Sequence, residues 1–597
     1  MYQDDRRSYS SRDARRRRRR RKKMLQALIP VAFAIVMIVI IAIIALRTGL
    51  FESFTYSAKK ADLNSYYQCM GDNSATVIVN GEMTPERITV KNGTCYLDLD
   101  TVRNSYTDRF FYDVNDSALL YTVAEGVIST MPDSTMYTLN GTGTQTGYTT
   151  CCFEGDQLFV ALDYVRQFVN FEFKLCGGNG EPYRAEIKRE WGTKVLVDVT
   201  KDTDIRIEPN KKADIVREVR EGAALTVYSS EGEDWLKVGT DDLAIGFVEK
   251  KYLGEKYEQQ ETPVTDVADV VIPTVADGSK VVLAWHNVVN ESAASYLKDY
   301  SSYFQYFNTV SPTCFYICDN DGNIDSILTH DYVEAAHNAG LKVWGLVENM
   351  THSEVSIAEI LAYSSKRAHL IEQLVSYAKE YQLDGINVDI EQLPSEAGEA
   401  FVQFIRELVL EAHKYNIVIS VDNYVPQGYT SHYGRKEQGV FADYVIIMGY
   451  DEHYSGSETS GSVASLPFVL DGIEQTIADV PAEKVINALP FYTRLWIETS
   501  GIISEVQTLD MTKAAETVAS AGATPKWDEE TGQNYAEWGG DTNRHKIWLE
   551  DADSLAAKLG VMQAHNVAGV AVWQLAYSTQ PAWETISSYY PIAGGSQ

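Results

Sequence analysis

Apolar runs alternate with amphipathic segments through the last half of the chain. The amphipathic segments, such as Lys366–Glu380 and Glu396–Lys414, carry apolar residues at three- and four-residue steps and predict helices. Eight apolar runs predict strands: Val281–Asn287, Val310–Ile317, Lys342–Asn349, Gly385–Glu391, Ile417–Asp422, Tyr444–Tyr450, Val485–Tyr492 and Val570–Leu575. Residues 278–593 therefore predict an α/β (β/α)8 TIM barrel, with an aromatic-rich insertion at about 493–565 between the last two strands.

A longer apolar run lies near the N-terminus. Residues 24–46 contain no charge and are long enough to cross roughly 30 Å of hydrocarbon. A cleaved signal peptide is the alternative, but its apolar core usually spans only about 7–15 residues. The basic block Arg15–Lys23 favours a cytoplasmic N-terminus, and we expect residues 1–23 to form a disordered tail. The sequence predicts a single-pass protein of the cell membrane whose remaining residues face the cell wall.

The region between this helix and the barrel predicts a stalk (47–75) and two small modules. In residues 76–190, Thr94–Val102 and Gln157–Val165 share one pattern, each after an Asn-Gly turn and before an aromatic strand, which indicates a duplicated α+β module. This module resembles the N-terminal, non-catalytic domain of copper amine oxidases. It has no His cluster, so the resemblance does not imply copper.

Short alternating strands in residues 192–254 predict a small all-β barrel. Ile205–Pro209, Gly222, Trp235–Val238 and Gly246–Val248 give this segment a resemblance to the bacterial Src-homology-3-like module, which implies binding of cell-wall peptide; a structural spacer is the alternative. Residues 255–277 are polar and predict a linker.

Composition narrows the possible ligands. The net charge of −31 disfavours nucleic acid as a partner. Seven cysteines form neither a disulfide framework nor a zinc pattern. The segment Asp319–Asn323 has its glycine at the fourth position rather than at the sixth position of a calcium loop, so it predicts a turn. We expect no metal and no cofactor.

Polar and aromatic residues gather where the predicted barrel strands end, which is where such barrels carry their active sites. Asn387, Asp389 and Glu391 alternate along one strand and therefore share a face. Three polar groups on one face of a buried strand are costly unless they are used there, although a salt-bridged or capping cluster is the alternative. The other strand-end residues are Trp285, His286, Asn287, Glu348, Asn349, Asp422, Asn423, Met448, Tyr450, Asp451, Tyr492, Arg494, Trp573 and Gln574.

Three motifs match one enzyme family. Asp384–Glu391 resembles the D-x-x-D-x-D-x-E strand of glycoside hydrolase family 18, Met448–Asp451 its M-x-Y-D motif, and Trp573 its strand-eight tryptophan. The barrel is identified as a member of this family. Three further segments are similar to its spore-germination and cortex-lytic branch, whose members are N-acetylglucosaminidases acting on peptidoglycan: Pro490–Trp496, Trp527–Gln533 and Lys546–Glu550.

The resemblance implies substrate-assisted retaining hydrolysis, in which the 2-acetamido oxygen of the sugar is the nucleophile. Glu391 would be the general acid, with a pKa raised by burial and by neighbouring carboxylates. Asp389 would orient the acetamide N–H and stabilise the positive ring, Tyr450 would hydrogen-bond the acetamide, and Asp451 would support it. The expected substrate-binding residues are Asn387, Trp573, Trp285, Glu348, Asn349, Met448, Tyr492 and Arg494.

Two departures from the family pattern are visible. Asn387 occupies a position where the family often has Asp, and an amide cannot share a proton with Asp389, so the coupled titration of an Asp–Asp pair is not expected. The cortex-lytic branch also carries Asn there. That branch usually carries wall-binding LysM repeats, and this chain has none, which leaves a role in the spore open.

The sequence thus predicts a membrane-anchored extracellular glycosidase that cuts β-1,4 bonds after N-acetylglucosamine in peptidoglycan or chitin-like glycans. A catalytically silent wall-binding lectin or scaffold on the same barrel is the alternative. Lectins of the family typically lose the residue that corresponds to Glu391, so its presence favours the enzyme.

Overall fold

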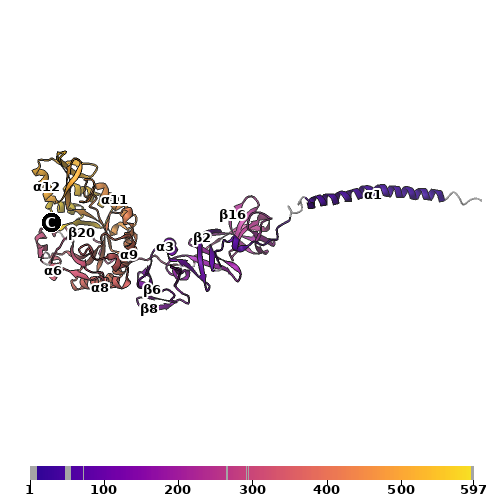
Figure 1. Ribbon diagram of the computed structural model, residues 1–597, viewed down its shortest axis with the longest axis horizontal. Coiled ribbons are helices and arrows are strands. Elements are labelled where there is room, and N and C mark those ends of the chain that lie inside the picture. Colours follow the sequence, from indigo (N-terminus) through magenta and orange to yellow (C-terminus); the bar gives the residue numbers. More distant parts are fainter. Residues whose placement is uncertain are drawn as a thin grey trace, which may run out of the picture. The chain divides into compact units, whose positions relative to one another are not determined.

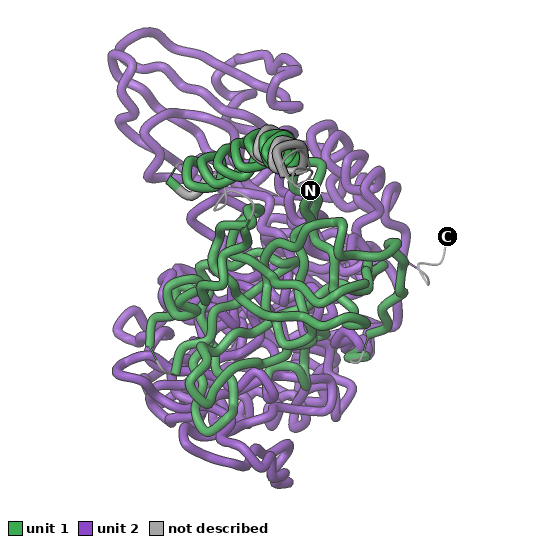
Figure 2. The backbone as a smooth tube through the Cα atoms, turned by 90° about the vertical axis from the view of Figure 1, so that its right-hand side faces the viewer, with its two compact units in different colours: residues 1–97, 165–267 green, residues 98–164, 268–597 purple. Residues whose placement is uncertain are grey.

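The chain divides into two compact units. The computed structural model describes residues 10–47, 55–71, 73–263, 266–290, 292 and 295–592. Unit 1 holds residues 1–97 and 165–267, and unit 2 holds residues 98–164 and 268–597 (Figure 2). The chain therefore crosses from one unit to the other after residues 97, 164 and 267.

The apolar run near the N-terminus lies in one long helix, α1 (Ser10–Arg47) (Figure 1). Its segment Arg16–Ile44 has a mean hydropathy of 3.2 in its most apolar window and is long enough to cross a membrane. Helices of this kind occur both in anchors and in signal sequences. The disorder predicted for residues 10–23 is wrong, because Arg and Lys are good helix formers and extending an existing helix is cheap. Residues 1–9 of the predicted tail, and residues 48–54 and 72 of the predicted stalk, lie outside the described residues.

Two sheets make up most of unit 1. Of the first, a seven-stranded sheet, unit 1 holds the strands β11-β12-β1-β2-β3, in this order. Their bounds are Glu172–Gly178, Glu181–Lys188, Ser74–Val79, Glu82–Lys91 and Thr94–Asp98. The second sheet has the order β15-β14-β18-β17-β16-β13-β19. Its strands span Ile215–Val219, Thr203–Arg206, Ile245–Glu249, Trp235–Gly239, Ala224–Glu231, Thr193–Val199 and Leu253–Gln260.

The two copies of the sequence repeat each form a strand followed by a short helix. β3 leads into α3 (Leu99–Ser105), and β10 (Gln157–Ala161) leads into α4 (Leu162–Val165). β10 pairs with β9 (Cys151–Glu154) in unit 2. A duplicated module stays a prediction.

The barrel predicted for the last half of the chain is confirmed. Eight parallel strands close on themselves, because β20 pairs with both β21 and β33. In chain order the strands are β20 (Val281–His286), β21 (Thr309–Ile317), β23 (Lys342–Glu348), β24 (Gly385–Asp389), β25 (Val418–Tyr424), β26 (Tyr444–Met448), β27 (Val485–Pro490) and β33 (Gly569–Trp573). The short strand β22 (Ile324–Ser326) extends the sheet antiparallel to β21.

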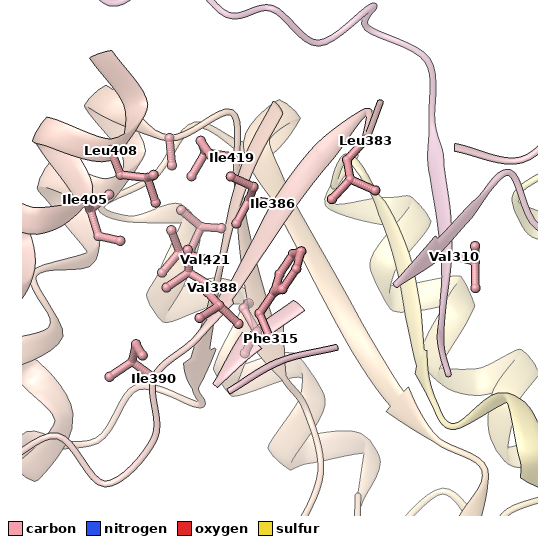
Figure 3. Packing of buried hydrophobic residues seen from close by; sticks show 14 of the residues in the cluster. Val310, Phe315, Leu383, Ile386, Val388, Ile390, Ile405, Leu408, Ile419 and Val421 are labelled. Atoms are coloured by element: carbon pink, nitrogen blue, oxygen red, sulfur yellow. The ribbon is translucent and has the colours of Figure 1, made fainter. Parts of the chain in front are cut away.

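Helices surround this sheet. Their bounds are α6 (His330–Asn338), α7 (Ile357–Leu361), α8 (Ser364–Glu380), α9 (Gly398–His413), α10 (Arg435–Phe441), α11 (Leu466–Ile477), α13 (Ala552–Ala564) and α14 (Gln580–Tyr589). Ile405 and Leu408 of α9 belong to the same buried cluster as Ile386 and Val388 of β24 and Ile419 of β25 (Figure 3). Burying each such side chain stabilises the folded state by about 1.5–3 kcal/mol. These contacts hold β24 in its register within the barrel.

The predicted aromatic insertion forms a separate antiparallel sheet between β27 and α13. Its strands lie in the order β29-β28-β32-β31-β30, and α12 (Met511–Ser520) packs on it. In chain order the strands are β28 (Tyr492–Thr499), β29 (Ile502–Asp510), β30 (Lys526–Asp528), β31 (Gln533–Gly540) and β32 (Asn543–Leu549).

Unit 2 also contains a five-stranded antiparallel meander, residues 110–145, which lies within the segment predicted as a duplicated module. Its strands are β4 (Phe110–Asp113), β5 (Ala118–Val123), β6 (Gly126–Thr130), β7 (Met136–Leu139) and β8 (Thr142–Gln145). Phe111 and Leu120 are buried in the same cluster as the barrel core. The compact unit around the barrel is thus larger than the predicted segment 278–593.

Side chains of the meander cap the N-terminus of α8. The N-cap residue Tyr363 offers no side-chain cap. Instead, Asp113 accepts hydrogen bonds from the backbone N–H and the hydroxyl of Ser364, and Asp116 accepts one from the N–H of Ser365 at 2.9 Å. These carboxylates satisfy donors that a helix terminus leaves free and lie at the positive end of the helix dipole.

Buried charges tie the meander to the barrel at two places. Arg367 is fully buried. Its Nη1 lies 3.7 Å from Oδ2 of Asp113, and its Nε lies 3.0 Å from Oε2 of Glu407. Glu437 accepts a hydrogen bond from Arg109, which directly precedes β4 of the meander, at 2.9 Å. It accepts another from Arg406 of α9 at 2.7 Å. Breaking a buried pair leaves an uncompensated charge, so these contacts make the meander part of the folded barrel unit.

Candidate active site

A cavity of about 200 Å³ lies where the barrel strands end. Eight of the twelve predicted site residues line it: Trp285, Asp389, Glu391, Met448, Tyr450, Asp451, Tyr492 and Trp573. The other four, Asn387, Glu348, Asn349 and Arg494, lie behind the wall and bond to lining residues or to the adjoining backbone, as described below. Two lining residues, Asp422 and Tyr424, were not among the predicted site residues.

Glu391 is held rigidly just beyond the end of β24. Asn349 accepts a hydrogen bond from its backbone N–H at 2.9 Å and donates one to its carbonyl oxygen at 3.0 Å. The Tyr424 hydroxyl donates to Oε2 of Glu391 at 2.7 Å. Burial raises the pKa of Glu391, the charges of Asp451 and Glu348 raise it further, and the Tyr424 bond opposes the shift. A raised pKa favours the protonated form that a general acid requires.

Asp389 presents an unused acceptor to the same cavity. Its Oδ1 atom is buried and has no hydrogen-bond partner within the described part of the chain. Burial raises the pKa of Asp389 well above its usual range, and the charges of Asp422, Glu391 and Glu348 add to the shift. An unsatisfied buried acceptor costs about 1–3 kcal/mol, so a ligand that donates an N–H here recovers that free energy.

Asn387 lies below Asp389 and is fully buried. Its Oδ1 accepts hydrogen bonds from Trp285 at 2.8 Å and Ser311 at 3.2 Å. Its Nδ2 donates to Ser420 at 3.0 Å and to Oδ1 of Asp422 at 2.8 Å. All four partners come from other strands, so Asn387 fixes the position of Trp285 and Asp422 in the cavity wall.

Two further carboxylates flank the site. Asp451 accepts hydrogen bonds from Tyr492 and Arg494, each at 2.7 Å, so residues at the start of the insertion orient it. Glu348 accepts hydrogen bonds from the backbone N–H groups of Met350 and Thr351. Both carboxylates are therefore positioned by donors and add negative potential at Glu391.

Aromatic side chains form the apolar walls. The rings of Trp285 and Trp573 meet edge to face at a centroid distance of 6.0 Å, and those of Tyr450 and Tyr492 at 6.3 Å. Trp573 is half-buried, whereas Trp285 is 1% exposed. Aromatic faces of this kind suit the apolar C–H surface of a sugar ring, with the polar groups of the site arranged around it.

Two residues of the cavity wall had no role assigned from the sequence: Asp422, which was named only as a strand-end residue, and Tyr424, which was not named. Both follow the same alternation as the residues that were assigned. Ser420, Asp422 and Tyr424 alternate along β25, and β25 pairs in register with β24. Comparing the two strands residue by residue would have placed Asp422 beside Asp389. The intervening Asn423 is fully buried and bonds to Gln438 at 2.7 Å.

His286 does not join the site. It is buried, its ring stacks on Tyr332 at a centroid distance of 5.8 Å, and its Nδ1 lies 3.1 Å from the Tyr332 hydroxyl. Burial lowers the pKa of His286 to about 4. A neutral histidine in this position packs and does not transfer protons at neutral pH.

Tyr424→Phe removes the hydroxyl that stabilises the anion of Glu391. We expect the pKa of Glu391 to rise further, so that Glu391 stays protonated to higher pH and the alkaline limb of the activity profile moves to higher pH. The measurement is kcat/KM as a function of pH. Tyr454→Phe, on an exposed ring, is the control and should leave the limb in place. A shift of the limb to lower pH contradicts the assignment of this limb to Glu391.

Comparison with known proteins places this site in a family. Residues 257–577 match the model of glycosyl hydrolases family 18, and residues 201–254 match that of the bacterial SH3 domain. The chain is 23% identical to the uncharacterized glycosylase YvbX of Bacillus subtilis (strain 168) over 300 residues, 48% of this chain and 86% of that protein. It is 24% identical to the cortical fragment-lytic enzyme of the same organism over 318 residues, 51% of this chain and 72% of that protein.

Among solved structures, the chitinase from Chromobacterium violaceum ATCC 12472 aligns with a TM-score of 0.47 at 23% identity, covering 53% of this chain and all of that one. The family model spans more than half of the chain and includes the barrel strands up to β33, whose ends carry the cavity. The chain belongs to glycosyl hydrolases family 18 and is a glycoside hydrolase.

Proposed function

We propose that the protein hydrolyses β-1,4 bonds after N-acetylglucosamine in peptidoglycan or a chitin-like glycan by substrate-assisted retaining catalysis. The observation that carries this proposal is the unsatisfied Oδ1 of Asp389 beside Glu391 in an aromatic-walled cavity. A sugar with a 2-acetamido group offers an N–H that can donate a hydrogen bond to Oδ1 of Asp389. The same group offers a carbonyl oxygen that can act as the nucleophile.

The steps assign one role to each group. Glu391 gives its proton to the glycosidic oxygen while the acetamide oxygen attacks C1, so the C1–O bond breaks and an oxazolinium ring forms. Asp389 accepts the acetamide N–H and stabilises the positive ring. Water then attacks C1, Glu391 takes up its proton, and the ring opens with retained configuration. Tyr450, supported from the side by Asp451 and Tyr492, hydrogen-bonds the acetamide oxygen.

The remaining parts of the chain support a place at the cell wall. We propose that α1 anchors the protein with its basic end in the cytoplasm, because the positive block precedes the apolar segment. The module matched by the bacterial SH3 model would then bind wall peptide outside the membrane. The similarity to a cortical fragment-lytic enzyme favours peptidoglycan over chitin as the glycan.

The test uses the full chain in detergent micelles, incubated with purified peptidoglycan and separately with chitin oligosaccharides. Mass spectrometry identifies the new reducing ends. Fragments that end in N-acetylglucosamine support the proposal. Fragments that end in N-acetylmuramic acid overturn the bond named here, and sedimentation of the protein with the wall without any cleavage favours the silent lectin.

A further inference from the structure

Asp389 and Asp422 lie side by side on neighbouring strands. The parallel register of β24 and β25 pairs Asn387 with Ser420 and Val388 with Val421, so the next residues along each strand are Asp389 and Asp422. Neighbouring strands are about 4.8 Å apart, and alternate residues point to the same face. Both side chains line the cavity at the strand ends.

Asn387 fixes which oxygen of Asp422 is free. Because Oδ1 of Asn387 already accepts from Trp285 and Ser311, its Nδ2 must be the atom that faces Asp422. Oδ1 of Asp422 is therefore held as an acceptor at 2.8 Å, and Oδ2 is the oxygen that remains for a proton. Asp422 itself is 2% exposed.

The surroundings disfavour two negative charges at this place. Glu391 acts on both Asp389 and Asp422, and Glu348 at the end of β23 acts on Asp389. The phenol of Tyr450, just beyond the end of β26, lies in the field of Asp389, Asp422 and Glu391. Burial raises the pKa of both aspartates. The charges of Asp422, Glu391 and Glu348 add to the shift at Asp389, whereas at Asp422 the hydrogen bond from Asn387 opposes the shift and the charge of Glu391 adds to it. Arg494 is bonded to Asp451. Two adjacent buried carboxyl groups then hold one proton between them.

We propose that Asp422 is a positioning residue that shares one proton with Asp389 and so replaces the aspartate that the family often carries at position 387. In the resting site the proton lies on Asp389 and Asp422 carries the charge. When the oxazolinium cation forms, the O–H bond of Asp389 breaks and one forms on Oδ2 of Asp422, so the pair keeps its single negative charge. The charge thereby moves next to the cation without a proton leaving the site. This inference depends on the proposed function for the role of Asp389.

A pair of variants tests it in the full chain. Asp422→Asn keeps an oxygen that accepts the Asn387 N–H, so a purely structural role for Asp422 would survive the change. The proposal instead expects kcat to fall about tenfold or more while KM changes less than about threefold. The exchange variant Asn387→Asp/Asp422→Asn restores a carboxyl partner on the same face as Asp389, and we expect it to recover kcat to within about threefold of wild type.

A second readout does not require activity. Carboxyl groups whose folded pKa is raised stabilise the protein fully below their unfolded pKa, and this stability is lost as pH rises through the folded pKa. Above about pH 4 the wild type should therefore lose thermal stability with rising pH relative to Asp422→Asn, so that the difference between their thermal midpoints changes with pH, and the exchange variant should follow the wild type.

The outcomes separate the inference from the proposed function. If the wild type cleaves no N-acetylated glycan, the proposed function fails, and the proton-sharing pair is then decided by the pH dependence of the thermal midpoint. Wild-type kcat in Asp422→Asn, or an exchange variant that recovers neither kcat nor the pH dependence, overturns the pair.

Discussion

Replacement of Glu391 by glutamine is expected to lower kcat by about a thousandfold, since a positioned general acid contributes about 10²–10⁴ in rate and the amide has no proton to give. The substitution preserves shape, because the amide oxygen can still accept the Tyr424 hydroxyl and the backbone clamp of Asn349 does not involve the side chain. Substrate binding should be retained, so KM should stay within a few-fold of wild type. The measurement is steady-state release of reducing ends from the glycan that the wild type cleaves.

Glu396→Gln is the matched control, because Glu396 is exposed just beyond the same strand end and should tolerate the change. Retention of more than about a tenth of wild-type kcat by Glu391→Gln would show that another group donates the proton. Loss of activity in both variants would point to a general sensitivity of this loop.

Asp113→Ala is expected to destabilise unit 2 by about 3–5 kcal/mol, although Asp113 lies far from the cavity in sequence and contributes nothing to it. The carboxylate is fully buried, caps α8 through Ser364 and lies near the buried Arg367. Its removal takes away a cap worth about 0.5–2 kcal/mol and leaves the fully buried Arg367 with less charge compensation. Denaturant unfolding followed by tryptophan fluorescence measures the change, since several buried tryptophans lie in the barrel.

Asp156→Ala serves as the control for this variant. Asp156 is an exposed residue in the turn between β9 and β10 of the same unit, so its loss should change the free energy of unfolding by less than about 0.5 kcal/mol. If both variants unfold at the same denaturant concentration, the cap and ion pair contribute no net stability.

Local pattern was enough to predict the barrel, because each strand is an apolar run and each helix a run with helical spacing. The site followed from the same pattern: the C-terminal ends of parallel strands meet, so residues such as Glu391 and Tyr450 had to converge. Strand ends were placed to within about two residues, since β24 ends at Asp389 rather than Glu391.

What the sequence could not show depends on contacts between distant segments. The hydrogen bond that the Ser364 hydroxyl donates to Asp113 joins residues 251 positions apart, and no local sequence pattern predicts it. Tyr424 differs from the many other tyrosines only in the hydroxyl partner that β25 brings near. The helical form of residues 10–23 depends on the neighbouring apolar helix, which their Arg and Lys residues extend.

The path of the chain also affects how the barrel can be separated from the N-terminal helix α1 by proteolysis. Residues 98–164 belong to unit 2, yet both of their ends continue into unit 1, and α1 belongs to unit 1. The barrel itself is joined covalently to the preceding chain only through the segment at residue 267, so a single proteolytic cut between residues 260 and 270 breaks that link. The barrel should nevertheless stay with the fragment that carries α1, held by Arg109, Asp113 and the apolar contacts of the meander, and should separate only in denaturant. Complete covalent separation of unit 2 from unit 1 therefore calls for two further cuts, one near residue 97 and one near residue 164.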